Sequence, residues 1–177
     1  AAGSPHVAPA TAFISHAYDD EFLGIIDSVR ALEAREGTSA FYYFDLLVVN
    51  QHGQGAVVPF EVLRDEFGRS VKAIGRTLLV LRWADPIPLK RAWCVFEMAT
   101  SLAVVGSLKV LMPPADSKRF IEVLREGDLD SLILKTCHVD VELAQAMQQT
   151  DLEDILSIIK SGEGFPKTNQ RVIEAIK

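Results

Sequence analysis

The residues best placed to do chemistry lie in one apolar segment, RAWCVFEMATSL at positions 91–102. Trp93 and Glu97 are four residues apart in this segment, so on a helix they share one face. A carboxylate that is surrounded in sequence by apolar residues is poorly explained by solvent exposure. Beside a large aromatic wall, it is a candidate for acting on a bound ligand. The simpler alternative, a helix carboxylate paired with Lys90 or Arg91, stays open at this point.

Several familiar catalytic and nucleotide-binding motifs are missing from the sequence. No GxGxxG, GxxxxGK[ST], HExxH, GxSxG or repeated CxxC motif occurs, so dinucleotide oxidoreductases, P-loop enzymes and zinc or serine hydrolases have no support. The four histidines lie on separate segments without the spacing of metal ligands, and we expect no metal site. Cys94 has no nucleophile-and-base arrangement near it, and we expect it to be a buried packing residue.

Alternating strands and helices must position the segment that carries Glu97. Apolar runs predict strands at residues 11–15, 40–49, 77–82 and 109–112, with a candidate fifth edge strand at 136–139. Helical spacing predicts helices between them that end at Gly37, Gly75 and Gly106, and terminal helices at 141–147, 152–159 and 170–176. This alternation implies βαβ units and a mostly parallel sheet with helices on both faces.

The candidate site lies at one edge of this predicted sheet. Ligands of open parallel sheets bind beyond the carboxyl ends of the strands, where the strand order switches direction. The segments that reach this edge are residues 16–20, 50–55 and 83–89, together with the start of the helix that carries Trp93 and Glu97.

Length and composition restrict the class of protein. The chain has 177 residues, of which 49% are hydrophobic, and a net charge of −6. It is too apolar for a disordered tail and too acidic for a general nucleic-acid binder. We expect one globular domain over residues 11–177, after a flexible lead at 1–10. No apolar run approaches the roughly 20 residues that span a bilayer, and no signal peptide is recognisable, so we expect a cytoplasmic protein.

Charge is spread unevenly along the chain. Residues 61–91 carry seven basic and four acidic groups, a net charge of +3 in an otherwise acidic protein. The simpler interpretation is a solvated helix face, and the alternative is a local field that attracts an anionic ligand. The sequence begins AAGSPHVAP without a methionine, which suggests a domain taken from a longer protein.

Two motifs resemble those of TIR domains. FISHAYDDEF at the end of the first predicted strand resembles the first box of that family, and WCVFE resembles a signature region of plant TIR domains. The longer pattern W-x-x-P-x-P-L-x-R-A-W-C-x-x-E, with YYFDLLVVNQH and IGRTLLVL, is similar to TIR-like domains of repeat-containing protist and algal proteins. The resemblance covers residues 11–112 and is weaker over 113–177. It implies an α/β, flavodoxin-like three-layer domain with a mostly parallel sheet of four to five strands and extra C-terminal helices.

The resemblance also implies an activity. In TIR domains that cleave NAD⁺, the glutamate of this motif is the catalytic residue, and it maps onto Glu97. The expected reaction breaks the bond between nicotinamide and ribose and yields ADP-ribose or a cyclic derivative, with NAD⁺ as substrate and no further cofactor. His16 and Trp83 are expected to stack on rings, and Trp93 is expected to form an apolar wall. Arg82, Lys90 or Arg91 is expected to face the pyrophosphate, and Ala17 and Asp45 complete the substrate-binding set.

The loop NQHGQGAVVP at residues 50–59 is the counterpart of the BB loop, which resembles a lid in the family. Its Asn50, Gln51 and His52 either hydrogen-bond the substrate or cap the preceding strand. This chain has His16 and Ala17 where active TIR domains commonly carry an aromatic and then a basic residue.

Two other functions remain open on the sequence alone. Many TIR domains act only by associating with one another, and residues 53–60 would then form a docking surface. Self-association is also compatible with catalysis, because composite active sites can need two protomers. A nucleoside-processing enzyme, such as a deoxyribosyltransferase, would likewise place a glutamate at the ribose, but the spacing of Trp93 and Cys94 favours a TIR domain.

Overall fold

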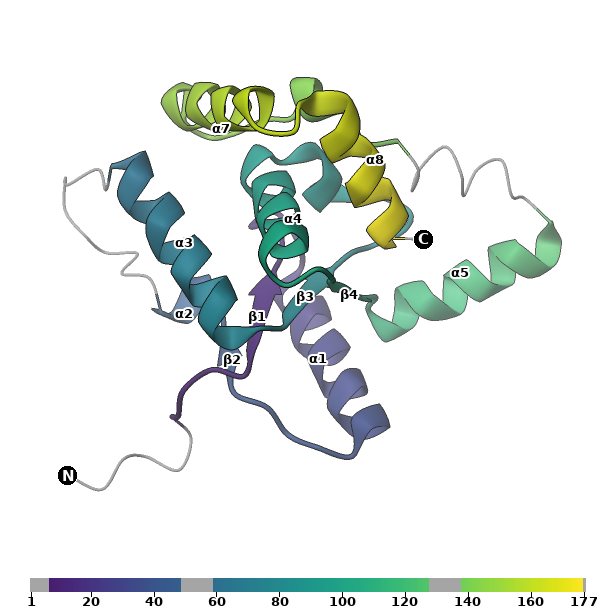
Figure 1. The fold of residues 1–177 in the computed structure, drawn as a ribbon. Coiled ribbons are helices and arrows are strands. Elements are labelled where there is room, and N and C mark those ends of the chain that lie inside the picture. Colours follow the sequence, from purple (N-terminus) through teal and green to yellow (C-terminus); the bar gives the residue numbers. More distant parts are fainter. Residues whose placement is uncertain (1–6, 49–58, 128–137, 177) are drawn as a thin grey trace.

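Four parallel strands form the central sheet, in the order β2-β1-β3-β4 (Figure 1). The computed structural model describes residues 7–48, 59–127 and 138–176. In that part of the chain the strands are β1 (Ala12–Ser15), β2 (Tyr42–Tyr43), β3 (Thr77–Val80) and β4 (Lys109–Leu111). The α/β class, the parallel sheet and the flavodoxin-like three-layer arrangement predicted from the sequence are confirmed. The order switches direction between β1 and β3, so these two strands border the expected ligand edge.

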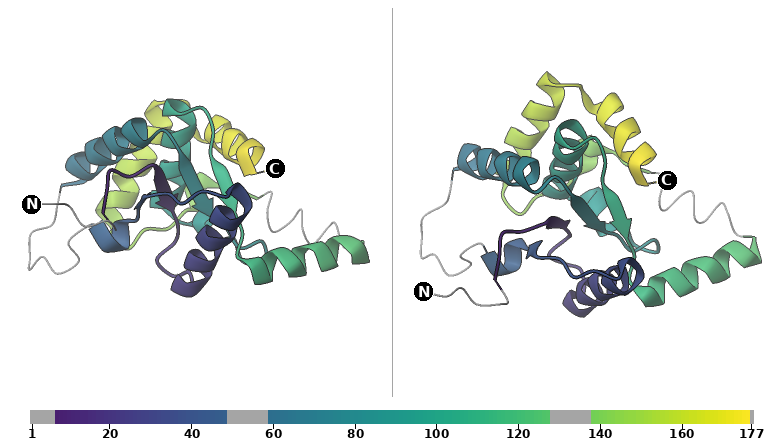
Figure 2. Two further views of the ribbon diagram at one scale, coloured as in Figure 1. Left: turned by 90° about the horizontal axis from the view of Figure 1, so that it is seen from below. Right: turned by 60° about the horizontal axis from the view of Figure 1, so that its bottom comes forward.

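Helices cover both faces of the sheet (Figures 1 and 2). One face is covered by α1, and the other by α3 and α4, with α7 and α8 packed outside α4. A further helix, α5, contacts α1 near its start and then extends away from the body. The bounds are α1 (Phe22–Glu36), α2 (Asp45–Val48), α3 (Phe60–Ile74), α4 (Ala92–Val104), α5 (Pro114–Glu126), α7 (Gln149–Ser161) and α8 (Phe165–Ile176).

Side-chain alternation along the strands produces two apolar cores. Ile14 of β1 and Leu78 of β3 point toward α1 and pack with Ile25. Leu79, the next residue along β3 and the register partner of Ser15, faces the opposite side and belongs to the larger core beneath α3, α4, α7 and α8. Phe13 lies on this second side as well, since its ring packs edge-on against Phe67 of α3. The same alternation turns Ser15 toward the α4 side, where Glu97 lies.

The predicted second strand is wrong over most of its length. Within residues 40–48, the described part of this run, Tyr42 and Tyr43 alone form strand β2, and the chain then turns into the short helix α2. The prediction assumed a strand covered on both faces, but β2 lies at the edge of the sheet, where its side chains are half-buried. Because β2 ends at Tyr43, Asp45, the first residue of α2, lies within hydrogen-bond distance of His16 and Tyr18.

The C-terminal part also differs from the prediction. In the candidate fifth strand at 136–139, the last two residues, His138 and Val139, form no strand, and the first two lie outside the described residues. The predicted helix at 141–147 is only a 3₁₀ turn at Val141–Leu143. Beyond that turn the chain runs parallel to the start of α4: the N–H of Gln145 donates to the carbonyl of Lys90, and its carbonyl accepts from Ala92. Backbone pairing with the start of α4 therefore replaces the predicted helix.

Two of the glycines predicted to end helices do so. Gly37 and Gly75 end α1 and α3, with φ of 66° and 70°, a left-handed conformation that favours glycine. None of the helices in the described ranges combines the length and the apolarity that crossing a bilayer requires.

We expect Leu79→Ala to destabilise the fold strongly. Leu79 is fully buried in β3, so truncation removes apolar contacts and leaves a cavity, at a cost of about 2–5 kcal/mol in the free energy of unfolding. Urea denaturation followed by circular dichroism measures this loss. The matched control is Leu47→Ala in α2, because Leu47 is 73% exposed and its truncation should change stability by less than about 0.5 kcal/mol. Equal losses in the two variants would contradict the assigned core.

Candidate functional site

The candidate site centres on a contact between the end of β1 and the middle of α4. The Ser15 hydroxyl donates a hydrogen bond of 2.6 Å to Oε2 of Glu97. Ser15 is fully buried, and Glu97 is partly buried on the face of α4 that packs over β1. The contact lies at the carboxyl end of β1, beside the switch point of the sheet. Glu97 thus occupies the ligand edge that the sequence predicts for it.

The environment of Glu97 disfavours its charged form. Burial raises the pKa of its carboxyl to about 8, although the hydrogen bond from Ser15 favours the carboxylate and works in the opposite direction. The nearby charge of Asp45 raises the pKa of Glu97 further, and the charge of His16 lowers it. At neutral pH the unliganded side chain is therefore mostly a neutral carboxyl group.

Neither basic residue before α4 pairs with Glu97. The guanidinium of Arg91 lies 3.3 Å from Asp19, and the ammonium of Lys90 lies 2.6 Å from Asp85. The interpretation of Glu97 as a helix carboxylate paired with Lys90 or Arg91 is thus wrong. Within the described residues, Glu97 forms no ion pair with a lysine or arginine, and its carboxyl group accepts a hydrogen bond from a hydroxyl. A buried carboxyl group with such a raised pKa is the kind of perturbed group that clusters at functional sites.

His16 does not present its ring to a ligand. Its side chain is only 1% exposed, with Tyr18 stacked on one side at 5.5 Å between ring centroids and Phe44 packed edge-on at 4.8 Å. This placement argues against the prediction that His16 stacks on a substrate ring. Tyr18, which is 50% exposed, is the aromatic residue that the turn after β1 presents instead.

Asp45 connects this turn to the short helix α2. Its Oδ1 lies 2.8 Å from Nε2 of His16, and its Oδ2 accepts a hydrogen bond of 2.7 Å from the Tyr18 hydroxyl. Hydrogen bonds from His16 and Tyr18 outweigh the effect of burial and lower the pKa of Asp45. Ala17 is buried and contributes its backbone, with its carbonyl 3.0 Å from Nδ1 of His16.

Trp93 and Cys94 lie next to Glu97 on α4 and contact different parts of the fold. The Trp93 ring packs against Phe60 and Phe96, and its Nε1 donates to Asp151 of α7 at 3.0 Å. This half-buried ring can serve as an apolar wall, as predicted, but α7 determines its orientation. Cys94 is buried as expected, its thiol donates to the carbonyl of His16, and burial raises its pKa well above the ordinary value.

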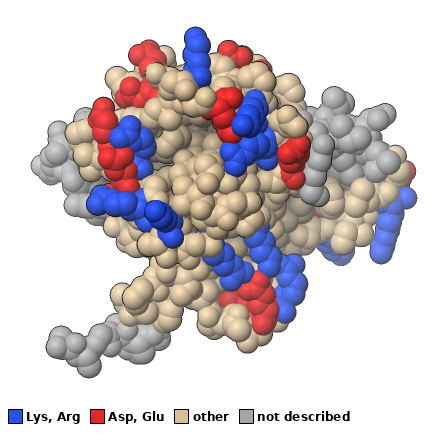
Figure 3. Space-filling view, viewed as in Figure 1, with Lys and Arg blue, Asp and Glu red and all other residues tan. Residues whose placement is uncertain are grey.

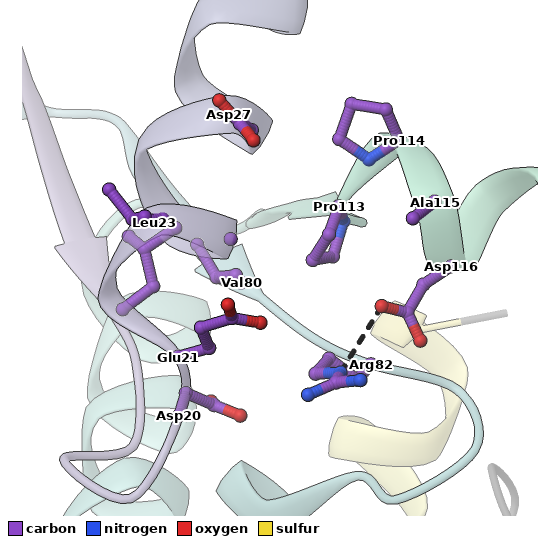
Figure 4. Close-up of a pocket in the computed structure, with 12 residues that line it drawn as sticks. Asp20, Glu21, Leu23, Asp27, Val80, Arg82, Pro113, Pro114, Ala115 and Asp116 are labelled. Carbon is purple, nitrogen blue, oxygen red and sulfur yellow. Dashed lines mark hydrogen bonds and ion pairs between the residues drawn. The ribbon is translucent and has the colours of Figure 1, made fainter.

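Trp83 and Arg82 lie away from Glu97, after the end of β3. Trp83 is 3% exposed and contacts Phe120 of α5, which argues against the predicted stacking on a substrate ring. Arg82 lines a groove of about 460 Å³ between the start of α1 and the start of α5, where it forms an ion pair with Asp116 at 3.1 Å (Figure 4). Figure 4 shows Asp20 and Glu21 on the opposite wall, so the groove is largely acidic.

The basic segment 61–91 does not form an isolated positive surface. Ion pairs with carboxylates engage most of its basic side chains, and Figure 3 shows acidic and basic groups side by side on the face that carries α3. Arg76, for example, binds Glu36, which Lys109 also contacts. The paired residues of the segment are Arg64, Arg76, Arg82, Lys90 and Arg91. The solvated-face interpretation therefore describes this segment better than a local field does.

The structure brings Glu97, His16, Ala17 and Asp45 together, with Trp93 on the same helix as Glu97. The predicted residues Asn50, Gln51 and His52 lie outside the described residues. Sequence reasoning missed Ser15 and Tyr18. Ser15 could have been found from its position, because the last residue of a central strand reaches the ligand edge and alternation selects its face. Across the described ranges, no three His, Cys, Asp or Glu side chains gather in a way that could hold a metal ion.

Fold and site together define an α/β protein with a glutamate at the carboxyl edge of a parallel sheet, where burial raises the pKa of its carboxyl group to about 8. Comparison of the chain with protein-family models, with curated proteins and with solved structures finds no match in any of the three.

We expect Glu97→Gln to stabilise the protein at alkaline pH. The folded-state pKa of about 8 exceeds the ordinary value of 4.5, so between these two values the folded state holds a proton that the unfolded state releases. This linkage lowers the free energy of unfolding by up to about 1.4 kcal/mol for each pH unit that the solution rises within that window. Glutamine is neutral at every pH and removes this slope. Thermal unfolding from pH 5 to 9 tests the expectation, which a parallel pH dependence of the two proteins would contradict.

Proposed function

We propose that this chain is a TIR-like enzyme that cleaves the bond between nicotinamide and ribose in NAD⁺, with Glu97 as its catalytic residue. The single observation that carries the proposal is the Glu97 carboxyl group at the carboxyl edge of β1, held by Ser15 at 2.6 Å. The resemblance of WCVFE and FISHAYDDEF to TIR motifs supports the same assignment, because these two segments supply Glu97 and Ser15.

The chemistry requires little beyond a positioned carboxylate. The bond between the ribose C1′ and the nicotinamide nitrogen breaks, and its electron pair neutralises the pyridinium ring. Positive charge then develops on the ribose, where the Glu97 carboxylate stabilises it. Water adds to C1′ and releases a proton, which gives ADP-ribose. Attack by another nucleophile of the same molecule gives a cyclic derivative.

The positive charge of the nicotinamide ring counteracts the raised pKa of Glu97. A neutral Glu97 carboxyl group must lose its proton before it can stabilise the ribose cation. A pyridinium ring nearby favours that loss, since an adjacent positive charge stabilises a carboxylate. Ser15 remains hydrogen-bonded to the carboxylate and orients it. Trp93 supplies an apolar surface that limits access of water to the same face of α4.

We expect Glu97→Gln to abolish cleavage while it leaves the fold intact. Glutamine keeps the shape and can still accept the hydrogen bond from Ser15, but it carries no charge that could stabilise the ribose cation. Nicotinamide release from NAD⁺, measured by chromatography, should fall at least about 100-fold. The matched control is Glu122→Gln on the exposed side of α5, which should retain wild-type turnover. Full activity of Glu97→Gln would overturn the assignment.

We expect the pH dependence of cleavage to follow the ionisation of Glu97. The active form is the carboxylate, so kcat/KM should rise about tenfold per pH unit below pH 8 and level off above it. A pH series of initial rates at subsaturating NAD⁺ measures this profile. A profile that is flat from pH 6 to 9 would contradict the role of Glu97, and absence of turnover at every protein concentration would favour the interaction module instead.

A further inference from the structure

His16 is surrounded by hydrogen-bond acceptors on both sides of its ring. Nε2 lies 2.8 Å from Oδ1 of Asp45, and Nδ1 lies 3.0 Å from the carbonyl oxygen of Ala17. A backbone carbonyl accepts hydrogen bonds and cannot donate them. A neutral imidazole has one N–H group and one lone pair, so in this position it would direct the lone pair at an acceptor.

The carboxyl group of Asp45 is itself an acceptor only. It receives hydrogen bonds from the Tyr18 hydroxyl and from the backbone N–H of Leu46, in addition to the contact with His16. Three donors converge on its two oxygens, an arrangement that a carboxylate satisfies and a protonated acid does not. Both ring nitrogens of His16 must therefore donate, which requires the imidazolium form.

We propose that His16 is a positioning residue, held as a buried imidazolium between Asp45 and Ala17, that fixes the end of β1 so that Ser15 stays against Glu97. The catalytic consequence rests on the function proposed above, whereas the charge state of His16 does not. The backbone carbonyl of His16 accepts a hydrogen bond from the Cys94 thiol at 3.2 Å. This bond joins the turn after β1 to α4, one helical turn before Glu97. The pair of His16 and Asp45 thus connects β1, α2 and α4 around the carboxyl group.

The positive charge of His16 also acts on Glu97. The imidazolium favours the carboxylate, and Asp45 disfavours it. Removing His16 alone leaves the Asp45 charge without compensation near Glu97, so Glu97 should become harder to ionise. Replacing both by neutral amides removes the two opposing charges together. In the described part of the chain, the other charged or titratable groups around this cluster include Asp20 in the turn after β1, Tyr43 of β2, Glu66 of α3, Arg82 after β3, Arg91 before α4 and Cys94 of α4.

Nitrogen NMR of the histidine rings tests the charge state directly. In ¹⁵N-histidine-labelled protein at pH 7, both ring nitrogens of His16 should show the protonated form, and the spectrum of His16→Gln identifies the signals among the four histidines. Asp45→Asn should return His16 to the neutral form at the same pH. The exposed control Asp65→Asn on α3 should leave the signals unchanged. An unprotonated ring nitrogen of His16 in the wild-type protein would overturn the proposal.

The effect on Glu97 is tested by variants that a purely structural role would not distinguish. The Glu97 titration, followed by carbon NMR of its carboxyl group, should move alkaline by roughly one pH unit in His16→Gln. In the double variant of His16→Gln with Asp45→Asn, the midpoint should return to the wild-type value or below it. Equal alkaline shifts in the single and double variants, or no shift in either, would overturn the charge coupling.

The same variants separate this proposal from the proposed function. If NAD⁺ is cleaved, the pH profile of kcat/KM should move with the carboxyl titration, and the double variant should regain the wild-type midpoint. If the wild-type protein cleaves no NAD⁺, the proposed function fails, and the two NMR measurements still decide whether His16 is an imidazolium that acts on Glu97.

Discussion

The site depends on one hydrogen bond, from the Ser15 hydroxyl to the carboxyl group of Glu97. It requires that β1 end at Ser15 with that side chain on the α4 side, and that the face of α4 carrying Glu97 pack over β1. The first requirement follows from strand alternation, because Phe13 and Ser15 share a face. The second follows from the apolar residues of α4, which make it the central helix of the larger core. A polar contact is thus placed by the packing of apolar residues around it.

The same packing sets an energetic conflict at Glu97. Burial favours the neutral acid, whereas the cleavage proposed for this site needs the carboxylate. Without a ligand, the pKa of about 8 favours the neutral form of Glu97 at pH 7. A positive charge beside Glu97 would lower the pKa of its carboxyl group and favour the carboxylate. Under the proposed function, the pyridinium ring of NAD⁺ supplies that charge.

The sequence predicted the parts of the site that depend on local pattern. Helical spacing placed Trp93 and Glu97 on one face, and apolar runs located β1, β3 and β4, because both signals come from residues close in the chain. The burial of His16 could not be predicted in this way. It depends on β2 ending after two residues, so that Asp45 turns back toward β1 and Tyr18 covers the ring. Likewise, only the tertiary fold shows that Arg82 lies in an acidic groove.

The ion pairs of the basic segment restrict how an anionic group could be bound. Asp116 is 8% exposed, so withdrawing Arg82 would leave a buried carboxylate without its partner, which is strongly unfavourable. Arg91 differs, because its partner Asp19 has a side chain that is 63% exposed and can be hydrated when the pair separates. The Arg91 side chain itself is 24% exposed, so this ion pair is exposed on the carboxylate side only. Arg91 is also the residue that immediately precedes α4, the helix of Glu97, whereas Arg82 lies beyond the switch point on the side of α1 and α5. Of the two arginines, Arg91 is therefore the one whose ion pair opens at the lower cost, and under the proposed function it is the better candidate to bind a phosphate oxygen.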